Sequence, residues 1–243
     1  MTDRPVIASA DSPQWPRAAI YFSPAADSAL HHFGSSWLGR DAFTAAACTQ
    51  PSLAAIDAGR LHTLTRSPRR YGFHATLRAP FHPADNTTIA QIIEHAESFA
   101  RTQESFLLPL QVENYKGFMA LTPRQASAAL STMEAALLAH FDPLVRPASE
   151  AERARRRKPG LSARQDAHLV RWGYPYVMDE FNFHMTLSER LNDAREAAIL
   201  FNELRTRTQE IIAAATAIDA ISVFVEAEKG APFIAAARLP FRA

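Results

Sequence analysis

The chain has 243 residues, of which 47% are hydrophobic and 21% charged, a composition typical of a soluble globular protein. Its 26 Lys and Arg residues balance 25 Asp and Glu residues, so no global electrostatic field recruits nucleic acid or an anionic membrane. A single cysteine, Cys48, excludes an intramolecular disulfide framework and a thiolate metal cluster.

The N-terminal segment, residues 1–16, is expected to be a flexible arm, and it has no apolar stretch long enough for a signal peptide. No run of about 18 apolar residues occurs in the sequence, so we expect no transmembrane segment. These two features predict a cytoplasmic protein.

Apolar patterns predict alternating strands and helices along the rest of the chain. The first half begins with a buried strand (18–22), a helix (26–39), a mixed stretch (40–68) and a strand (72–79). A helix (86–100), two strands joined by a short turn (106–113 and 117–122) and a further helix (124–141) follow. After a basic stretch at 149–158, the second half contains a helix (162–173), a strand (181–188), a long helix (192–214) and two closing strands (218–226 and 232–239). Asn86 and Thr87 are candidate caps of the helix that follows them, and Asn192 or Asp193 opens the long helix.

Two short patterns occur twice in the sequence. Phe-His-x-Thr-Leu stands at 73–77 and at 183–187, and Val-Glu-x-x-Lys-Gly stands at 112–117 and at 225–230. Each histidine strand is followed by a helix, a strand, a turn and a strand, with the second pattern at a similar distance. We therefore expect an internal duplication that forms two lobes related by a pseudo-two-fold axis.

The histidine and the threonine of each motif are expected to act together. In a strand, residues two positions apart project from the same face, so His74 lies beside Thr76 and His184 beside Thr186. The residue between them faces the apolar interior. Pseudo-two-fold symmetry would bring the two pairs together in one groove.

Such a cluster suits phosphodiester chemistry. One histidine takes a proton from the nucleophile and the other gives a proton to the leaving oxygen, because an unperturbed imidazole has both states accessible near neutrality. The threonine hydroxyls donate to phosphate oxygens as charge builds on them. The spacing of the histidines matches no zinc-binding pattern, so no metal and no cofactor are expected.

The two motifs resemble those of the two-histidine (2H) phosphoesterase superfamily, which includes bacterial 2′–5′ RNA ligases and cyclic phosphodiesterases. Three longer segments resemble an uncharacterised family encoded in bacterial phosphonate-utilisation operons: 70–81, 155–165 and 171–191. The resemblance implies that His74 and His184 are the catalytic acid/base pair and that Thr76 and Thr186 bind phosphate. It also implies a mixed α/β (α+β) fold that is duplicated and bilobal, 2H-phosphoesterase-like, with mostly antiparallel sheets lining a central groove and helices outside.

The expected domain organisation is a single bilobal domain over 17–243. Lobe 1 covers about 17–145 and contains the His74 motif, and lobe 2 covers about 166–243 and contains the His184 motif. A basic linker or flap at about 146–165 connects them.

The expected function is that of a metal-independent phosphodiesterase. It would hydrolyse a 1,2- or 2′,3′-cyclic phosphate of a ribose derivative or nucleotide, and the operon context places it in phosphonate metabolism. The alternatives are 2′–5′ RNA ligation or RNA end processing, and a non-catalytic regulator that binds a phosphate ligand. The expected partner is a small phosphorylated substrate such as a ribosyl cyclic phosphate, with RNA less favoured, no membrane, and a monomeric protein.

Four further residues are candidates for substrate binding. Arg78 follows His74 by four residues, so it lies on the same face if the strand is regular and is then able to bind a second phosphate. An exposed arginine at a strand end is the alternative interpretation. Arg70, Tyr71 and Tyr174 are the other candidates, although tyrosines are equally common in ordinary packing.

One dense cationic cluster lies in the basic stretch: Arg153, Arg155, Arg156, Arg157 and Lys158. Two interpretations stay open for it, a solvated helix face and a flap that closes over an anionic substrate. No aromatic residues are interleaved with these cations, which argues against RNA binding.

Overall fold

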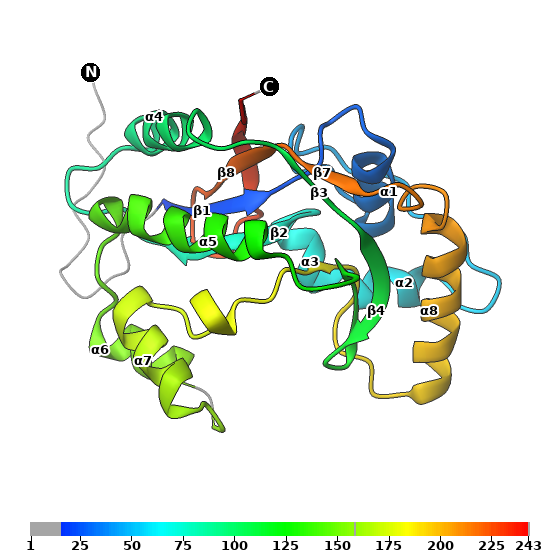
Figure 1. Cartoon of the computed structure of the whole chain (residues 1–243). Helices are drawn as coiled ribbons and strands as arrows, with labels where there is room; N and C mark the ends of the chain where they lie inside the picture. The colour runs from blue at the N-terminus through cyan, green and yellow to red at the C-terminus, as the bar shows by residue number, and fades with distance from the viewer. Residues whose placement is uncertain (1–15, 158, 243) are drawn as a thin grey trace, which may run out of the picture.

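The structure is a computed structural model and describes residues 16–157 and 159–242. Almost all of the predicted N-terminal arm, 1–16, lies outside the described residues. The described part of the chain forms a mixed α+β fold with a central antiparallel sheet and helices packed against it (Figure 1).

Within the described residues the central sheet has seven strands in the order β4-β5-β6-β2-β1-β8-β9, and each neighbouring pair is antiparallel. Its strands are β1 (Arg17–Phe22), β2 (Ala75–Phe81), β4 (Leu110–Tyr115), β5 (Phe118–Pro123), β6 (Met185–Thr186), β8 (Ala220–Glu226) and β9 (Ile234–Pro240). Two short strands, β3 (Phe106–Leu108) and β7 (Thr216–Ile218), pair separately as an antiparallel ribbon. This topology confirms the predicted mixed α+β class with mostly antiparallel sheets.

Helices pack against one face of the sheet and enclose the main hydrophobic core. They are α1 (Ala29–Leu38), α2 (Ala58–Leu64), α4 (Ile89–Ala100), α5 (Ala128–Phe141) and α8 (Ala194–Thr208). Alternate residues of β1, such as Ile20 and Phe22, meet Trp37, Leu137 and Leu204 of these helices in that core. The residues of β1 between them face the other side of the sheet, and that side carries the site described below.

Three further helices border this second side: α3 (Arg66–Tyr71), α6 (Glu150–Arg156) and α7 (Ala163–Trp172). In Figure 1, α6 and α7 lie below α5. Short 3-10 turns at Asp142–Leu144 and Met178–Glu180 complete the described elements. None of the helices in the described part of the chain combines the length and hydropathy needed to cross a membrane.

Polar caps set where most helices begin. A Ser, Thr or Asp side chain accepts a backbone N–H of the first turn in each case, at Ser28, Asp57, Thr88, Ser127, Ser149, Ser162 and Asp193. The cap of α8 is therefore one of the two predicted residues. The cap of α4 is Thr88, one residue after the predicted pair.

Three elements differ from their predictions. The mixed stretch 40–68 contains α2 and the first half of α3, which are too short to show a helical period. Strand β6 has two residues instead of the predicted eight. After its C-terminal end, Met119 N–H donates to the side chain of Ser188 (2.9 Å) and not to a backbone carbonyl, which stops the pairing there. Helix α8 ends at Thr208 and not near residue 214.

Each of the two β-hairpins lies beside a strand from the other half of the chain. Hairpin β4–β5 follows β2 in sequence but lies beside β6, whereas β8–β9 follows β6 but lies beside β1. Neither half of the chain therefore forms its part of the sheet alone. The duplication and the lobe boundaries at 17–145 and 166–243 remain predictions.

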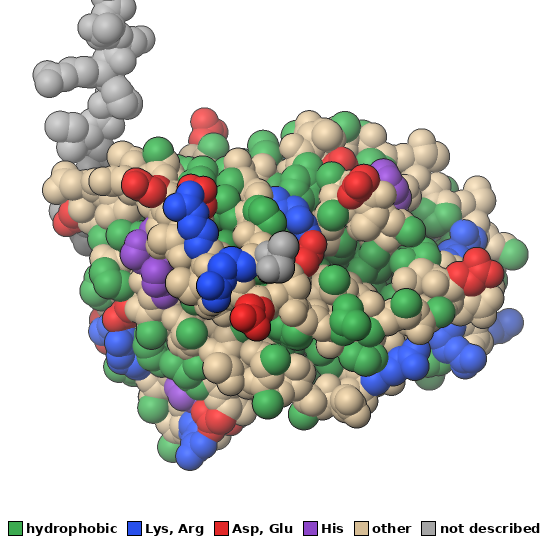
Figure 2. Space-filling model, turned by 45° about the horizontal axis from the view of Figure 1, so that its top comes forward, with side chains coloured by type: hydrophobic (Ala, Val, Ile, Leu, Met, Phe, Trp, Pro, Cys, Tyr) green, Lys and Arg blue, Asp and Glu red, His purple; other side chains and the backbone are tan. Residues whose placement is uncertain are grey.

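Acidic and basic side chains are interspersed over the face shown in Figure 2, in keeping with the formal net charge of +1. Any strong attraction for an anion must therefore come from a local arrangement of charges.

Candidate active site

The two His-x-Thr motifs meet where β2 pairs with β6. The pairing is antiparallel with Ala75 opposite Met185. This register sets His74 opposite Thr186 and Thr76 opposite His184, on strands about 4.8 Å apart. The structure thus brings together all four residues that the sequence predicts as catalytic or phosphate-binding.

Alternation in the strands sets the direction of these side chains. Ala75 and Met185 are fully buried in the main core, so their neighbours in the motifs project from the opposite face. On that face they line a groove, here called the histidine groove, with a volume of about 700 Å³ beside His74 and about 230 Å³ beside His184. Thr76, Tyr174 and Arg190 are among the residues that line both parts.

His74 is held in a defined orientation. Its ring stacks on Tyr21 with the ring centroids 3.8 Å apart, and its Nδ1 donates to the Gly72 carbonyl (2.8 Å). The neutral ring then has its lone pair on Nε2, which accepts from the Thr76 hydroxyl (3.2 Å). Nε2 is therefore the nitrogen that a ligand in the groove meets.

His184 repeats this local geometry. Its Nδ1 donates to the carbonyl two residues earlier, that of Asn182 (2.8 Å), and its ring stacks on Tyr115 at 5.1 Å. Phe118 packs against the ring at 5.7 Å. Both histidines are thus oriented by a carbonyl at position i−2, and in His74 the Nε2 also accepts from Thr76.

Burial depresses the pKa of both rings. The pKa of His74 falls from 6.5 to about 4, mainly because burial disfavours the imidazolium, and the nearby charge of His184 lowers it further. The pKa of His184 is lowered by burial and by the charge of Lys116. Without a ligand, both rings are therefore neutral at pH 7 and have the protonation state of a base.

Two cations in the histidine groove were missed by the sequence-based prediction. Lys116 Nζ lies 4.9 Å from the Tyr115 ring and 5.6 Å from the Tyr176 ring. Arg190 lies across Gly117, where an added Cβ would be 3.3 Å from Arg190 Nη1. The repeated Val-Glu-x-x-Lys-Gly pattern, which contains Lys116, was the available signal for one of them.

The other predicted substrate-binding residues divide into two groups. Tyr71 and Tyr174 line the histidine groove. Burial raises the pKa of Tyr174 to about 12, so its hydroxyl keeps its proton and can donate to a phosphate oxygen. Arg70 lies on the far side of Tyr71, with its guanidinium 5.4 Å from that ring and paired with Glu226.

Arg78 does not join the histidines. Tyr21 pairs with Thr76 but Ile20 pairs with Arg78, so the ladder contains a β-bulge between these positions. The extra residue reverses the alternation, and Arg78 points toward α5, where its Nη1 donates to the Leu138 carbonyl (3.1 Å). The predicted shared face required a regular strand, which the bulge removes.

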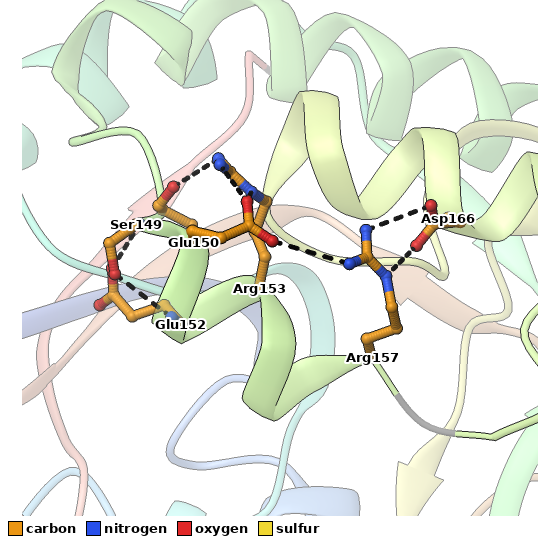
Figure 3. A network of polar contacts seen from close by, with 7 residues as sticks. Ser149, Glu150, Glu152, Arg153, Arg157 and Asp166 are labelled. Atoms are coloured by element: carbon orange, nitrogen blue, oxygen red, sulfur yellow. Dashed lines mark hydrogen bonds and ion pairs between the residues drawn. The ribbon is translucent and has the colours of Figure 1, made fainter.

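Part of the basic cluster is neutralised at the surface (Figure 3). Arg153 pairs with Glu150 (2.8 Å), and Arg157 pairs with Asp166 (2.6 Å). Lys158 lies outside the described residues. In the part of the chain that the structure describes, no group of three or more His, Cys, Asp or Glu side chains is placed to hold a metal ion.

Residues 76–234, more than half of the chain, match the model of a family described as "Protein of unknown function (DUF1045)". The chain belongs to this family. The DUF1045 match includes Thr76, His184 and Thr186 and begins just after His74.

The chain is also similar to two curated proteins that share one name, "Ribose 1,5-bisphosphate phosphokinase PhnN". Identity is 37% over 230 residues with the protein of Janthinobacterium sp. (strain Marseille), covering 93% of this chain and 51% of that protein. It is 34% over 218 residues with the protein of Laribacter hongkongensis (strain HLHK9), covering 89% and 50%. The chain thus spans about half the length of the curated relatives it matches.

The name of these relatives corrects the predicted function. A phosphokinase transfers a phosphoryl group, whereas the sequence predicted a hydrolase acting on phosphoric diesters. The prediction of a hydrolytic cyclic phosphodiesterase is therefore wrong, and the alternatives of RNA ligation, RNA end processing and non-catalytic regulation fit the name no better. The DUF1045 match and the PhnN names do fit the predicted relation to phosphonate-utilisation operons. Membership of the 2H superfamily remains a prediction.

Proposed function

We propose that the histidine groove binds a phosphorylated ribose and provides proton transfer in a phosphoryl-transfer reaction on it. The observation that carries this proposal is the register of β2 and β6, which sets two imidazoles and two hydroxyls in one groove. The curated relatives are named for a kinase of ribose 1,5-bisphosphate, and a small phosphorylated ribose suits a groove of this size and chemistry.

The polar groups of the groove suit a phosphoryl group. The hydroxyls of Thr76 and Thr186 are hydrogen-bond donors, and Lys116 and Arg190 add positive charge within the same groove. In phosphoryl transfer, negative charge is spread over the equatorial oxygens, and fixed donors and cations stabilise it. Tyr174 adds a hydroxyl that keeps its proton at neutral pH.

The histidines supply the proton transfer. As the acceptor oxygen of the sugar bonds to the transferred phosphorus, the bond from that phosphorus to the leaving diphosphate oxygen of ATP breaks, and a neutral Nε2 takes the proton of the acceptor oxygen. Both rings are neutral at pH 7 without a ligand. A bound phosphate favours the imidazolium form, so one ring becomes able to donate a proton once the ligand is present. The two rings therefore take opposite roles only in the loaded site.

The proposal assigns the sugar phosphate to the histidine groove, and the ATP used below as phosphoryl donor would bind to this chain without a glycine-rich phosphate loop. Its sequence has no Gly-x₄-Gly-Lys-Ser/Thr stretch, in which backbone N–H groups surround nucleotide phosphates. Gly34 and Gly39 have the glycine spacing, but Arg40-Asp41 follows them, and Gly34 lies inside α1.

Calorimetric binding at constant ionic strength tests the ligand. Ribose 5-phosphate and ribose 1,5-bisphosphate should bind, and unphosphorylated ribose should not. His74→Ala and His184→Ala should each weaken phosphate-ester binding by about tenfold, because hydrogen bonds to charged groups are worth about 1.5–3 kcal/mol. His32→Ala, which removes an exposed histidine of α1, is the matched control and should bind as the wild type does. Equal affinity for ribose and its phosphates would overturn the proposal.

Phosphoryl transfer tests the role of the histidines. The wild-type chain is incubated with ribose 1,5-bisphosphate and ATP, and transfer is followed by ³¹P NMR. Each histidine variant should lower the rate by roughly 10²–10⁴, the usual contribution of a positioned acid or base. Tight binding of the sugar phosphate without transfer would reduce the groove to a binding site and contradict the proton-transfer role.

A further inference from the structure

A second hollow with an excess of positive charge lies next to the histidine groove. It has a volume of about 520 Å³, and its lining contains five Lys or Arg residues and one Glu: Arg17, Arg70, Arg155, Arg156, Lys229 and Glu152. His82 and Gly230 complete the lining. We call it the basic hollow. None of its residues lines the histidine groove as described above, so it is a separate feature of the same side of the molecule.

The carboxylates at the basic hollow do not neutralise its cations. Glu226, fully buried, accepts from Arg17 Nε (2.6 Å) and also pairs with Arg70, so one negative charge serves two guanidinium groups. Glu152 lies in the wall but is also paired with Arg146 (3.0 Å). Among the described residues, the carboxylates of Glu226 and Glu152 are therefore outnumbered by the five cations that line the hollow.

Arg156 adds a positive charge that forms no ion pair with a carboxylate in the part of the chain that the structure describes. Its guanidinium donates to the carbonyls of Gly173 and Pro80, the latter at 3.1 Å. Carbonyl oxygens satisfy N–H groups but carry no formal charge, and burial lowers the pKa of this guanidinium because its charged form is desolvated. A bound anion would replace the lost solvation.

Two cations at the basic hollow have no partner among the described residues. Arg155 and Lys229 are exposed, and neither makes a hydrogen bond or an ion pair within 16–157 and 159–242. Arg153 on the same helix and Arg157, its C-cap, are paired with carboxylates (Figure 3). Helix α6 thus has paired arginines at some positions and presents an unpaired one to the hollow.

The repeated Val-Glu-x-x-Lys-Gly pattern contributes one lysine to each cavity. Its two glycines, Gly117 and Gly230, have nearly the same positive φ (92° and 90°), but the first copy ends in the short turn 116–117 and the second in the longer loop 227–233. The lysine of the first copy, Lys116, lines the histidine groove, and that of the second copy, Lys229, lines the basic hollow. The two copies of the pattern therefore supply a lysine to each of two neighbouring cavities, although the loops that carry them differ in length.

Two tyrosines separate the basic hollow from the histidine groove. The Arg70 guanidinium lies 5.4 Å from the Tyr71 ring, which is itself 6.2 Å from the His74 ring. On the other side, Arg156 donates to the carbonyl of Gly173, the residue before Tyr174. The walls of the two cavities are therefore in contact through these residues.

We propose that the basic hollow binds a second phosphate of the ligand held in the histidine groove, so that the protein selects sugars with two phosphates over sugars with one. The proposal rests on the proposed function for its sugar component. Guanidinium groups bind a phosphomonoester through paired charge-assisted hydrogen bonds, and lysine adds a mobile point charge. The expected ligand class is a ribose with phosphates at both ends of the sugar.

The first experiment uses two separate NMR reporters in isotopically labelled full chain. The Gly230 amide reports on the basic hollow, and the ring signals of His74 and His184 report on the histidine groove. Titration with ribose 1,5-bisphosphate should shift both sets. Ring shifts without a Gly230 shift would overturn the second phosphate site and leave the proposed function intact. A Gly230 shift without ring shifts would contradict the proposed function and leave the hollow as an anion site, and no shift at either would overturn both.

The second experiment measures selectivity by calorimetry at constant ionic strength. Arg155→Ala/Lys229→Ala removes the two unpartnered cations. It should weaken ribose 1,5-bisphosphate binding by about tenfold or more and ribose 5-phosphate binding by less than about twofold, because only the former reaches both cavities. Arg195→Ala/Arg242→Ala removes two exposed cations elsewhere, on α8 and at the C-terminal end, and controls for net charge. An equal loss for both ligands, or the same loss in the control, would overturn the proposal.

Discussion

A phosphate bound in the histidine groove should raise the pKa of His74 by more than two units. In the ligand-free protein this pKa is lowered from 6.5 to about 4, chiefly by burial of the ring, which stacks on Tyr21, and further by the charge of His184. An anion near Nε2 favours the imidazolium, so the direction of the change on binding is upward. His74 would then pass from a neutral base to a group that shares a proton with the ligand near neutral pH.

The size of the pKa change of His74 follows from two opposing free-energy contributions, burial of the ring and attraction to the bound anion. A pKa drop from 6.5 to about 4 corresponds to about 3 kcal/mol against the charged ring. One unit of negative charge about 4 Å from the ring, at an effective dielectric constant of about 20, contributes about 4 kcal/mol in its favour. A single anionic charge therefore offsets the burial term, and the pKa of His74 with ligand should be about 6.5 or above.

Histidine-selective NMR measures this pKa directly. The His74 ring signals are followed from pH 3.5 to 8.5 in the free protein, with saturating ribose 5-phosphate, and with the same concentration of unphosphorylated ribose. The phosphate ester should shift the titration upward, and ribose should leave it unchanged. A free-protein pKa near 6.5, or no upward shift with saturating ribose 5-phosphate, would refute the reasoning.

Three further substitutions test two buried positions near the histidine groove and one hydroxyl within it. Glu134 is fully buried, and burial raises the pKa of its carboxyl group to about 7. The folded state therefore binds more protons than the unfolded state, so the free energy of unfolding falls as pH rises from about 4.5 to 7. Glu134→Gln removes the charge and keeps an acceptor for the Met178 N–H (3.1 Å). Urea unfolding should therefore show that the variant is more stable than the wild type at pH 8.5 and nearly equal to it at pH 4.5. A variant less stable than the wild type at pH 8.5 would contradict this. Gly34→Ala would place a Cβ 2.0 Å from the Phe73 ring, so overpacking of about 1–3 kcal/mol should exceed the gain of about 1 kcal/mol in helix propensity; a raised melting temperature would be the contrary result. Thr76→Val removes the hydroxyl 3.2 Å from His74 Nε2, and calorimetry should show about tenfold weaker ribose 5-phosphate binding with less than about 1 kcal/mol change in unfolding free energy; unchanged affinity would remove Thr76 from the binding site.

Strands β2 and β6 show what the alternation of side chains in a sequence can predict and what it cannot. The alternation in Phe-His-x-Thr-Leu requires the residue between His and Thr to face inward, and Ala75 and Met185 are indeed fully buried. Local sequence does not specify which strands pair. That β2 lies directly beside β6, with Ala75 opposite Met185, depends on how the whole chain packs.

Arg78 and the hairpin lysines show what sequence spacing leaves open. A count of four residues placed Arg78 on the face of His74, but one extra residue in the β1–β2 ladder reversed its direction. Bulges depend on the packing of both strands and have no reliable signature in a short segment. Conversely, the repeat around Lys116 and Lys229 was visible in the sequence, but the cavities they line exist only after distant segments pack together.

The sequence by itself determined the strands and helices with a strong apolar period, the two His-x-Thr motifs and the side of each strand that carries them. These depend on interactions between residues close in the chain and on simple alternation. The tertiary structure decided the crossing of the hairpins, the pairing of β2 with β6, and the depressed pKa values of the two histidines. It also decided the position of the basic hollow, where cations from 17, 70, 155–156 and 229 meet. Strand pairing, burial and charge proximity all depend on contacts between residues far apart in the chain, so no local pattern of residues specifies them.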